Sequence, residues 1–583
     1  MPTTSMGDAL MNQRPPSKGA FLLILFLLLL PWAGADAAES RQAAIASAHP
    51  LATQAGMTIL HEGGNAFDAA VAVTAALAVV EPYSSGLGGG GFYLLHRASD
   101  GYEVMLDARE RAPLAGKRDM YLDDKGNPIP ESSINGPLSA GIPGIPAALV
   151  VLAREYGKLP LKQSLQPAIE LAEKGFEVDP YYRRMAGFRL DVLKQWPDSS
   201  RIFLDEGNLP DTGLLIRQPD LAETMRRIAD KGHDGFYAGE LAARLVDGVR
   251  AAGGIWSLRD LSEYRVVNRK PITGEYHDIQ ITTAAPPSSG GVVLIEMLNI
   301  LEGYDLASMD ELGRTQKIVE AMRRAYRDRA EYLGDPDFVK MPLKRLLSLD
   351  YAEQLREGIK PDAPTPSADL PLAGTAGGKG TDTTHFSILD ADGNRVAATL
   401  SINYPFGSCF VVPGTGVLLN DEMDDFSIKP GVPNVYGLVG AEANAIEPGK
   451  RMLSSMTPTF LDDGNRLAIL GTPGGSRIIT MLLLGTLEFA EGRGAQAIVT
   501  RPRFHHQYLP DVIQHEPDAF DVSLLQALDH MGYSLQGLDH TYGNMQAIVM
   551  NFRTGKLEAA SDPRGIGHAD VSDLGEAARV NTQ

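Results

Sequence analysis

The segment "GTDTTHFSILDADGNRVAATLSINY" (380–404) predicts a β-hairpin, and the fold prediction starts from it. Apolar and polar residues alternate along both of its strands, which is typical of a sheet whose two faces lie in different surroundings. A five-residue loop at 390–394 keeps both apolar sets on one face and pairs Phe386 with Ala398. A two-residue Asp-Gly turn would instead oppose Phe386 to Thr399, so the pattern disfavours it.

The five-residue loop gives the hairpin one polar face. That face holds three polar residues of each strand: Thr383, His385 and Ser387, and Thr399, Ser401 and Asn403. Opposed residues have Cβ atoms about 5 Å apart, so the hydroxyl groups of Thr383 and Ser401 lie within hydrogen-bonding reach. Two interpretations are open, an ordinary solvated sheet face or a catalytic one. The glycine-rich run "AGTAGGKG" directly before the hairpin favours the catalytic interpretation.

The threonine at the start of the first strand suggests a particular nucleophile. A hydroxyl group is weakly nucleophilic at neutral pH, but a threonine that begins a chain can use its own α-amine as the base. The pKa of such an amine, about 7.7 to 8, suits neutral pH. This chemistry requires cleavage between Asp382 and Thr383. His385 is the rival base, but it lies two residues along the strand, about 7 Å away, and is more typical of a structural histidine.

Length and composition exclude some classes of protein. The chain has 583 residues, a formal net charge of −20 and a single cysteine, Cys409. A chain of this length forms one large layered domain or several domains. Its negative charge disfavours nucleic acid as a partner, because phosphates would be repelled. One cysteine excludes an internal disulfide bond, and we interpret it as structural, with a cysteine nucleophile as the alternative.

The first 37 residues predict a secretory signal peptide. Arg14 and Lys18 precede the apolar run "AFLLILFLLLLPWAG" (20–34), and small residues follow at 35–37. The alternative, an uncleaved membrane anchor, requires a longer apolar span than this run provides. We therefore expect an exported protein, in the periplasm of a Gram-negative bacterium, without a stable membrane anchor.

The N-terminal part of the remaining chain is predicted to be mainly helical. The sequence from residue 43 predicts a helix, and 66–80 predicts a second, buried one before a glycine loop and a strand at 92–96. Residues 140–330 are mostly helical, and 315–335 shows helical periodicity with a charged outer face.

The C-terminal part differs in composition and in predicted secondary structure. Residues 361–382 are rich in Pro, Gly, Ala and Ser and predict a linker. Residues 383–470 are predicted to be rich in strands, and "GTPGGSR" (471–477) leads into a helix. Helices and strands are segregated along the chain, which favours an α+β fold.

Taken together, the motifs of the chain resemble those of the gamma-glutamyltransferase, or glutathione hydrolase, family. Besides the hairpin they are "GGNAFDAAVAV", "SSGLGGGGF", "LDARERAP", "LLNDEMDDFS", "KPGVPNVYGLVG", "RMLSSMTPT", "GTPGGSRII" and "RFHHQYLPD". The resemblance implies an N-terminal-nucleophile hydrolase with four αββα layers. It also implies a precursor that cuts itself at Asp382–Thr383 into a large subunit, 38–382, and a small catalytic subunit, 383–583, which stay associated.

The resemblance implies four catalytic residues. Thr383 would be the nucleophile both for self-cleavage and for turnover. Gly474 and Gly475 would form the oxyanion hole, where backbone amides before a helix favour negative charge. Ser401 stands where the family often has threonine; the hydroxyl is kept but the stiff β-branch is lost, so we expect slower maturation.

The resemblance also implies the residues that bind substrate. A guanidinium and two hydroxyl groups would hold its α-carboxylate, and three further polar side chains would face its α-ammonium group. These two sets are Arg109, Ser454 and Ser455, and Asn403, Glu422 and Asp425. Tyr436 would lie at the tip of a lid loop, 429–440, over the bound glutamyl group.

The implied activity is transfer of the γ-glutamyl group of glutathione and related compounds to water, amino acids or dipeptides. The nearest alternative is a cephalosporin-type (glutaryl) acylase of the same superfamily. A nucleotide-binding oxidoreductase is suggested by "GLGGGGF", but phosphate loops open a helix and these glycines lead into a predicted strand. A periplasmic solute-binding protein is the remaining alternative, and it would stay one chain.

No cofactor or metal is predicted. The adjacent histidines His505 and His506 are the most suggestive pair for a metal. Side chains of neighbouring residues point apart on a strand or a helix, so they rarely share one ion.

Overall fold

The computed structural model describes residues 41–370 and 383–575. The predicted signal peptide (1–37), the linker from residue 371 and Asp382 of the predicted cleavage point lie outside the described residues. The described residues belong to one compact unit that begins at Arg41. Within these ranges, no helix combines the length and the apolar character that crossing a membrane requires.

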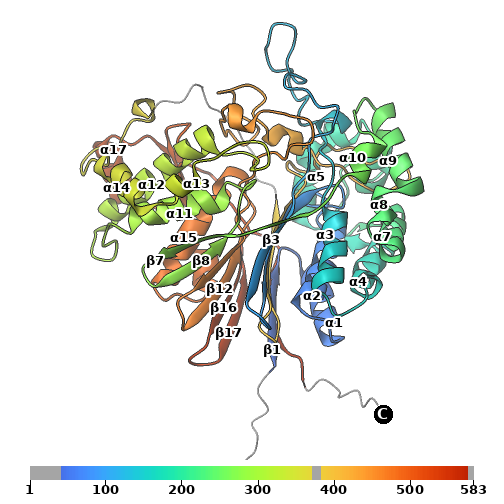
Figure 1. Ribbon diagram of the computed structural model, residues 1–583, viewed down its shortest axis with the longest axis horizontal. Coiled ribbons are helices and arrows are strands. Elements are labelled where there is room, and N and C mark those ends of the chain that lie inside the picture. Colours follow the sequence, from blue (N-terminus) through green and yellow to red (C-terminus); the bar gives the residue numbers. More distant parts are fainter. Residues whose placement is uncertain (1–40, 371–382, 576–583) are drawn as a thin grey trace, which may run out of the picture. The chain divides into compact units, whose positions relative to one another are not determined.

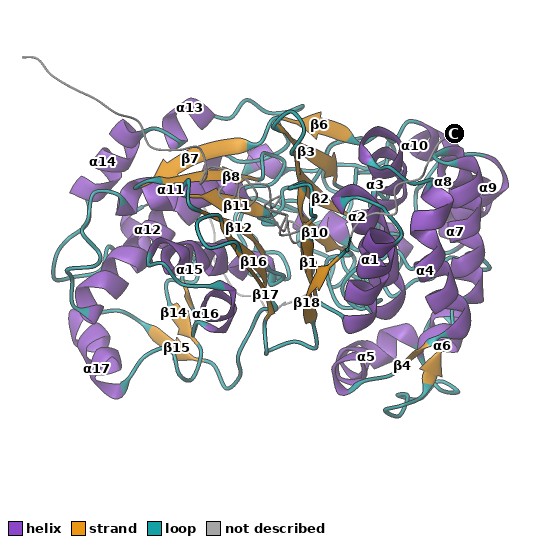
Figure 2. Cartoon of the chain, turned by 90° about the horizontal axis from the view of Figure 1, so that it is seen from below, coloured by secondary structure: helices purple, strands orange, loops and turns teal. Residues whose placement is uncertain are grey.

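Two antiparallel sheets pack face to face at the centre of this unit (Figure 1, Figure 2). The first has seven strands in the order β18 (His568–Asp573), β1 (Gln42–Ser47), β9 (Thr384–Leu389), β10 (Arg395–Ser401), β2 (Gly90–Arg97), β3 (Tyr102–Ala108) and β6 (Val267–Arg269). The second has six, in the order β17 (Lys556–Ser561), β16 (Gln546–Asn551), β12 (Arg466–Gly471), β11 (Thr459–Asp462), β8 (Ile279–Thr283) and β7 (Ile272–Tyr276). Two small sheets contain β13 (Phe504–His505), β14 (Ile513–His515) and β15 (Leu535–Gly537), and β4 (Phe176–Glu177) and β5 (Leu215–Ile216).

Helices flank the pair of sheets on both outer sides (Figure 1). Beside the first sheet lie α1 (Pro50–His61), α2 (Ala66–Val80), α3 (Ile145–Val151), α4 (Leu161–Lys174), α5 (Pro180–Leu193), α6 (Pro197–Phe203; Figure 2), α7 (Pro219–Lys231), α8 (Asp234–Tyr237), α9 (Gly239–Ala251) and α10 (Leu258–Ser262). Beside the second lie α11 (Gly290–Leu301), α12 (Glu311–Tyr332), α13 (Leu343–Leu346), α14 (Leu349–Glu357), α15 (Ile478–Ala490), α16 (Ala495–Thr500) and α17 (Val522–Met531).

Buried apolar side chains fill the three spaces between these layers. Ile388 packs in a core with α2, which is buried along its whole length as the sequence predicts. Phe92 and Ile469 belong to a core between the two sheets, and Leu470 points away from it into a core with α11 and α15. Neighbouring residues of β12 enter different cores, and so do Phe92 and Tyr93 of β2, so each sheet buries both faces. The predicted four-layer αββα fold is confirmed.

The predicted hairpin register is confirmed. Strands β9 and β10 pair antiparallel with Phe386 opposite Ala398 and Leu389 opposite Arg395, so the loop between them has five residues. The polar face of the hairpin is not solvated, however, because it faces the second sheet. There the Ser387 hydroxyl group lies 3.2 Å from the backbone oxygen of Ile469.

The first sheet contains strands from both before and after position 383 in the sequence, and they pair with one another. Strands β9 and β10 lie between β1 and β2, and β18 forms the edge next to β1. A break in the chain before Thr383 would therefore leave both fragments joined by backbone hydrogen bonds and by shared cores. The boundary between the two predicted subunits stays a prediction.

Three predictions of secondary structure or exposure need correction. The helix predicted from residue 43 begins only at Pro50, because residues 42–47 form β1 in the middle of a sheet. Residues 402–458 contain no long strand among the strands described, only turns and short 3₁₀ segments. The charged face of α12 does not point outward: Glu320, Arg323 and Arg324 are buried.

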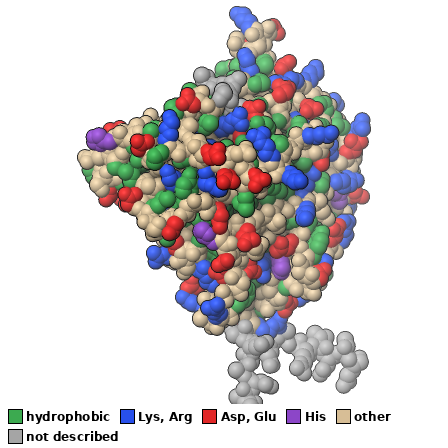
Figure 3. Space-filling view, turned by 60° about the vertical axis from the view of Figure 1, so that its left-hand side comes forward, with side chains coloured by type: hydrophobic (Ala, Val, Ile, Leu, Met, Phe, Trp, Pro, Cys, Tyr) green, Lys and Arg blue, Asp and Glu red, His purple; other side chains and the backbone are tan. Residues whose placement is uncertain are grey.

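The surface carries charges of both signs. On the face in Figure 3, acidic and basic side chains are interspersed. With the net charge of −20, this face offers no broad basic area of the kind that nucleic acid requires.

Candidate active site

The predicted site residues meet at one end of the strands of the first sheet. Thr383 directly precedes β9, Ser401 ends β10 and Arg109 follows β3. Since β9, β10, β2 and β3 are consecutive antiparallel strands, these three positions lie at the same end of the strands. A short 3₁₀ turn, Glu422–Asp425, and a second one that begins at Gly475 complete the site.

One cavity contains every predicted catalytic and substrate-binding residue except Gly474, which adjoins Gly475 in the chain. It is lined by Arg109, Thr383, Ser401, Asn403, Glu422, Asp425, Tyr436, Leu438, Ser454, Ser455, Met456, Gly475 and Ile478. Its volume is about 20 Å³, which is room for about one water molecule. A glutamyl group therefore requires some of these side chains to move.

Thr383 and Ser401 are adjacent hydroxyl-bearing residues in this cavity. Their oxygens lie 3.3 Å apart, and both residues are buried. The Ser401 oxygen also accepts a hydrogen bond of 2.8 Å from the backbone N–H of Asn403. Asn403 has a φ of +76°, a conformation that asparagine tolerates better than most residues, and its side chain donates to the backbone oxygen of Asp421. The turn after β10 thus fixes the Ser401 hydroxyl beside Thr383.

Arg109 lies at the centre of a buried group of charges. Its two terminal nitrogens lie 2.5 Å from Oε2 of Glu422 and 2.5 Å from Oδ2 of Asp425. Its Nε donates to the backbone oxygen of Met452 at 3.3 Å. The residues predicted to hold opposite ends of the substrate thus pair with one another in this structure. A buried guanidinium is retained only when paired in this way.

Two acidic residues beside Arg109, Glu422 and Glu110, hold protons more tightly than usual. Burial raises the pKa of Glu422 to about 7, although the Arg109 guanidinium opposes part of the rise. A further carboxylate, Glu110, lies 3.6 Å from Arg109, and neither of its oxygens has a hydrogen bond among the described residues. Burial, followed by the nearby Glu422 carboxylate, raises the pKa of Glu110 well above its usual value. Sequence reasoning missed Glu110, although it adjoins Arg109.

Ser454 and Ser455 are positioned by residues that the sequence analysis did not identify. The Ser455 hydroxyl accepts a hydrogen bond of 3.2 Å from Arg329 of α12. The same arginine donates to Ser289, whose hydroxyl donates at 2.6 Å to the backbone oxygen of Ser454. Arg329 belongs to the charged face of α12, so its role depends on that face being buried.

Gly475 and Tyr436 are in close contact. Gly475 has a φ of +56°, and a Cβ atom at this position would lie 2.4 Å from the Tyr436 ring. The Tyr436 hydroxyl group donates a hydrogen bond of 2.6 Å to the backbone oxygen of Asn403. The tyrosine therefore bridges the turn after β10 and the glycine turn before α15, over the cavity.

The comparisons with known proteins agree with this geometry. Residues 52–572 match the family model described as Gamma-glutamyltranspeptidase. The chain belongs to the gamma-glutamyltranspeptidase family. It is 42% identical over 533 residues to the glutathione hydrolase proenzyme of Escherichia coli (strain K12), covering 91% of each chain. It is 44% identical over 505 residues to that of Pseudomonas sp. (strain A14), covering 85% of this chain and 86% of the relative.

A solved structure shows the same fold. The crystal structure of cephalosporin acylase from Bacillus halodurans matches 91% of this chain and 96% of its own, with a TM-score of 0.79 and 30% identity. The family and this neighbour together identify the chain as a gamma-glutamyltranspeptidase-type enzyme with an N-terminal-nucleophile hydrolase fold.

His385 and Cys409, the alternatives to the proposed catalytic groups, have structural surroundings. His385 is fully buried, and its ring nitrogens lie 2.8 Å from the Thr399 hydroxyl and 3.2 Å from the Ser387 hydroxyl. Burial lowers the pKa of His385 to about 3, which makes it a poor base at neutral pH. Cys409 accepts a hydrogen bond from Arg189, and burial raises the pKa of its thiol to about 11. Such a thiol is unreactive.

The glycine loop before β2 allows close packing against the backbone of neighbouring segments. A Cβ atom at Gly88 would lie 2.0 Å from the backbone oxygen of Leu418, and one at Gly89 would lie 2.2 Å from that of Ser401. The loop leads into a strand, which rules out the phosphate-loop interpretation. Within the described part of the chain, no cluster of three or more His, Cys, Asp or Glu side chains is arranged to hold a metal ion.

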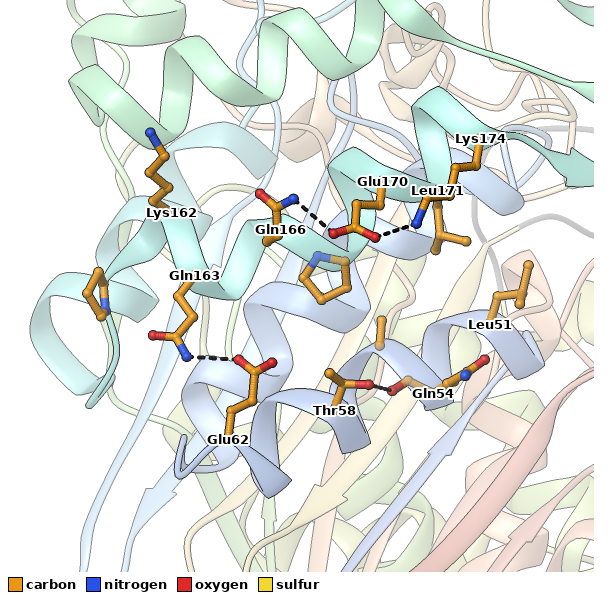
Figure 4. A pocket seen from close by; sticks show the side chains of 13 residues that line it. Leu51, Gln54, Thr58, Glu62, Lys162, Gln163, Gln166, Glu170, Leu171 and Lys174 are labelled. Carbon is orange, nitrogen blue, oxygen red and sulfur yellow. Dashed lines mark hydrogen bonds and ion pairs between the residues drawn. The ribbon is translucent and has the colours of Figure 1, made fainter. Parts of the chain in front are cut away.

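A larger cavity, about 580 Å³ in volume, lies between α1 and α4, away from this site (Figure 4). Its polar side chains bond to one another: Gln163 donates to Glu62, and Lys174 and Gln166 donate to Glu170. None of the predicted site residues lines it.

Proposed function

We propose that this enzyme is a gamma-glutamyltransferase and glutathione hydrolase whose nucleophile is Thr383. The observation that supports this most directly is the buried Thr383–Ser401 pair in the cavity that also contains Arg109, Glu422 and Asp425. A hydroxyl nucleophile beside a combined site for carboxylate and ammonium groups matches an amino-acid acyl donor.

The reaction begins with attack of the Thr383 oxygen on the γ-amide carbon. The threonine's free α-amine accepts the hydroxyl proton, and the amides at Gly474 and Gly475 stabilise the oxyanion. The C–N bond then breaks, and the leaving amine, cysteinylglycine in the case of glutathione, takes the proton. Water or an acceptor amino acid or dipeptide attacks the resulting ester, returns its proton through the amine and frees Thr383.

Substrate binding exchanges ion pairs within the site. The α-carboxylate of the glutamyl group binds Arg109 and the hydroxyl groups of Ser454 and Ser455. Its α-ammonium group takes the place of the guanidinium beside Glu422 and Asp425, with Asn403 as an additional partner. This exchange keeps every buried charge paired, which its burial requires. Tyr436 moves with its loop to admit the substrate and then covers it.

The nucleophile becomes competent by self-cleavage between Asp382 and Thr383. The large fragment, 38–382, and the small fragment, 383–583, stay together because their strands alternate in the first sheet. The relatives named above are described as proenzymes, which supports this maturation. The predicted signal peptide, 1–37, would direct the precursor to the periplasm.

A glutaryl acylase is the second candidate, because the Bacillus halodurans neighbour is a cephalosporin acylase. A glutaryl group has the terminal carboxylate of a γ-glutamyl group but no α-ammonium. It would leave Glu422 and Asp425 without a cation once Arg109 has turned to the carboxylate. The acidic pair therefore favours γ-glutamyl donors.

The test compares the wild-type protein with Thr383→Ala. We expect two wild-type fragments by intact mass, with the smaller beginning at Thr383 by N-terminal sequencing, and turnover of glutathione well above that of a glutaryl amide. Thr383→Ala should stay one inactive chain. A single uncut, active wild-type chain would refute the mechanism, and a preference for the glutaryl amide would favour the acylase.

A further inference from the structure

The catalytic cavity has a small neighbour, the side cavity, and Tyr436 lines both. The volume of the side cavity is about 20 Å³, and His505 and Gln507 of the motif "RFHHQYLPD" (503–511) are among its lining residues. Gln507 donates a hydrogen bond of 3.1 Å to the backbone oxygen of Gly437, next to Tyr436. The movement of Tyr436 and its loop that substrate binding requires would therefore change both cavities.

The side cavity carries a positive charge. Arg477 lines it, and no acidic side chain of the described residues does. Burial lowers the pKa of His505 to about 3, so this second basic group is neutral at neutral pH. An anionic group that entered the cavity would meet a cation and no opposing carboxylate.

The side chain of Arg477 has only neutral partners among the described residues. One terminal nitrogen donates a hydrogen bond of 2.8 Å to the side-chain oxygen of Gln514, and the guanidinium carbon lies 4.8 Å from the centre of the Tyr542 ring. Its Nε is buried without a hydrogen-bond partner in the described part of the chain. Burial lowers the pKa of Arg477, and no carboxylate is among the groups that oppose this fall. Buried charges are normally paired, so this guanidinium has donors to spare for an anion.

The position of Arg477 is fixed relative to Gly475, whose amide is proposed to stabilise the oxyanion. Both residues belong to one 3₁₀ turn, and Tyr326 of α12 donates a hydrogen bond to the backbone oxygen of Ser476 between them. Residues two apart have Cα atoms at most about 7 Å apart. A dipeptide spans a similar distance, at most about 7 Å, from its amine to its carboxylate, and a free amino acid spans about half of it.

We propose that Arg477 binds the terminal carboxylate of the dipeptide that leaves or accepts the glutamyl group. The inference rests on the proposed function and adds a part of the substrate to it. The glutamyl group fills the catalytic cavity with its γ-carbonyl at Thr383 and Gly475, and the attached dipeptide extends past Tyr436 into the side cavity. Cysteinylglycine and an acceptor dipeptide occupy this place in turn. The guanidinium matches a carboxylate, and its position selects a dipeptide over a free amino acid.

The test compares two donors that share the glutamyl group. Glutathione has a carboxylate on its leaving group, and γ-glutamyl-4-nitroanilide has none. The variant is Arg477→Met, and the matched control is Arg356→Met. Arg356 is also partly buried and donates to neutral groups, the backbone oxygens of Asn299 and Ile300, but it belongs to α14, which lines neither cavity. All proteins are compared at equal concentrations of processed enzyme, measured by intact mass.

We expect Arg477→Met to lower kcat/KM for glutathione by about tenfold or more, the effect of losing a charge-assisted hydrogen bond, and that for the anilide by less than about twofold. Arg356→Met should change neither. The wild-type enzyme should transfer the glutamyl group faster to glycylglycine than to glycylglycinamide, which has the same amine but no carboxylate. Arg477→Met should remove this difference. Should Arg477→Met fail to fold, Arg477→Lys and the wild-type comparison of acceptors provide the test.

The outcomes separate two failures. Equal losses for the two donors in Arg477→Met, no loss for glutathione, or equal wild-type rates with the two acceptors would overturn the role of Arg477 and leave the proposed function intact. A wild-type enzyme that releases the glutamyl group from neither donor would overturn both.

Discussion

The Thr383 and Ser401 hydroxyl oxygens lie 3.3 Å apart on neighbouring strands. The Ser401 oxygen is held by the Asn403 backbone N–H, so it is in place before any substrate binds. The hairpin register thus places the Ser401 hydroxyl where it can support Thr383, the proposed nucleophile.

Replacing Ser401 tests this support. We expect Ser401→Ala to slow both processing and glutathione turnover about tenfold, the effect of losing one hydrogen bond of about 1.4 kcal/mol. Ser401→Thr should process faster than the wild type, because the β-branch restricts the hydroxyl to fewer rotamers. Rates of fragment formation check both. Unchanged rates in the alanine variant would contradict the role.

Removing Arg109 should affect stability as well as activity. Arg109→Met would leave the buried Glu422 and the partly buried Asp425 without their cation, a cost of about 3–5 kcal/mol. Arg109→Lys keeps the charge but loses the planar fork, so we expect a smaller fall in Tm and a loss of about a hundredfold in kcat/KM.

The control for Arg109 is a rescue. Adding Glu422→Gln to Arg109→Met removes one unpaired charge and should recover part of the lost Tm, without recovering activity. If Arg109→Met melts like the wild type, the charge group does not depend on this arginine.

The hairpin could be predicted in detail because its information is local. A period of two and a loop length fix the pairing of β9 with β10, and hence the neighbour of Thr383. What covers the polar face could not be predicted. Alternation separates two faces but does not say whether water or a second sheet lies against one of them, and the second sheet comes from sequence far from the hairpin.

Partners that are distant in sequence also explain why the charged face of α12 was wrongly predicted to point outward. The pattern of α12 gives a charged face, but its partners, such as Asp511, lie almost two hundred residues away. Arg109 likewise meets Glu422 across 313 positions of sequence. Alanine favours helices, yet the alanine-rich residues 42–47 form β1, because pairing on both sides in the sheet outweighs that preference.

The contact between Gly475 and Tyr436 gives a prediction about the proposed oxyanion hole. Gly475→Ala adds a Cβ atom 2.4 Å from the Tyr436 ring and places a side chain at a φ of +56°, which costs about 1–2 kcal/mol in backbone strain alone. We expect kcat to fall at least tenfold. Gly474→Ala would contact only the flexible end of Met481, although its φ of +139° also disfavours a side chain.

A second substitution separates clash from strain at Gly475. Tyr436→Ala removes the ring, so the double variant Gly475→Ala/Tyr436→Ala should differ little in kcat from Tyr436→Ala alone if the clash dominates. A full additional loss in the double variant would assign the effect to the backbone.

Stability should fall in acid because of buried histidines. Burial lowers the pKa of His385 to about 3, whereas an unfolded chain has the ordinary value of about 6.5. Below pH 6.5 the unfolded state therefore binds a proton that the folded state does not. Stability is complete above that pH and is lost as the pH falls toward 3, by up to about 1.4 kcal/mol per pH unit for this residue.

The urea midpoint of the uncut Thr383→Ala chain, measured from pH 7 to pH 4.5, checks this. Adding His385→Gln should lower stability at pH 7, because the glutamine fits the bonds to Thr399 and Ser387 less well, but it should make the pH dependence shallower. Replacing the exposed His540 with Gln reports any effect common to losing a histidine. An equally steep curve with and without His385 would mean that other groups cause the acid sensitivity.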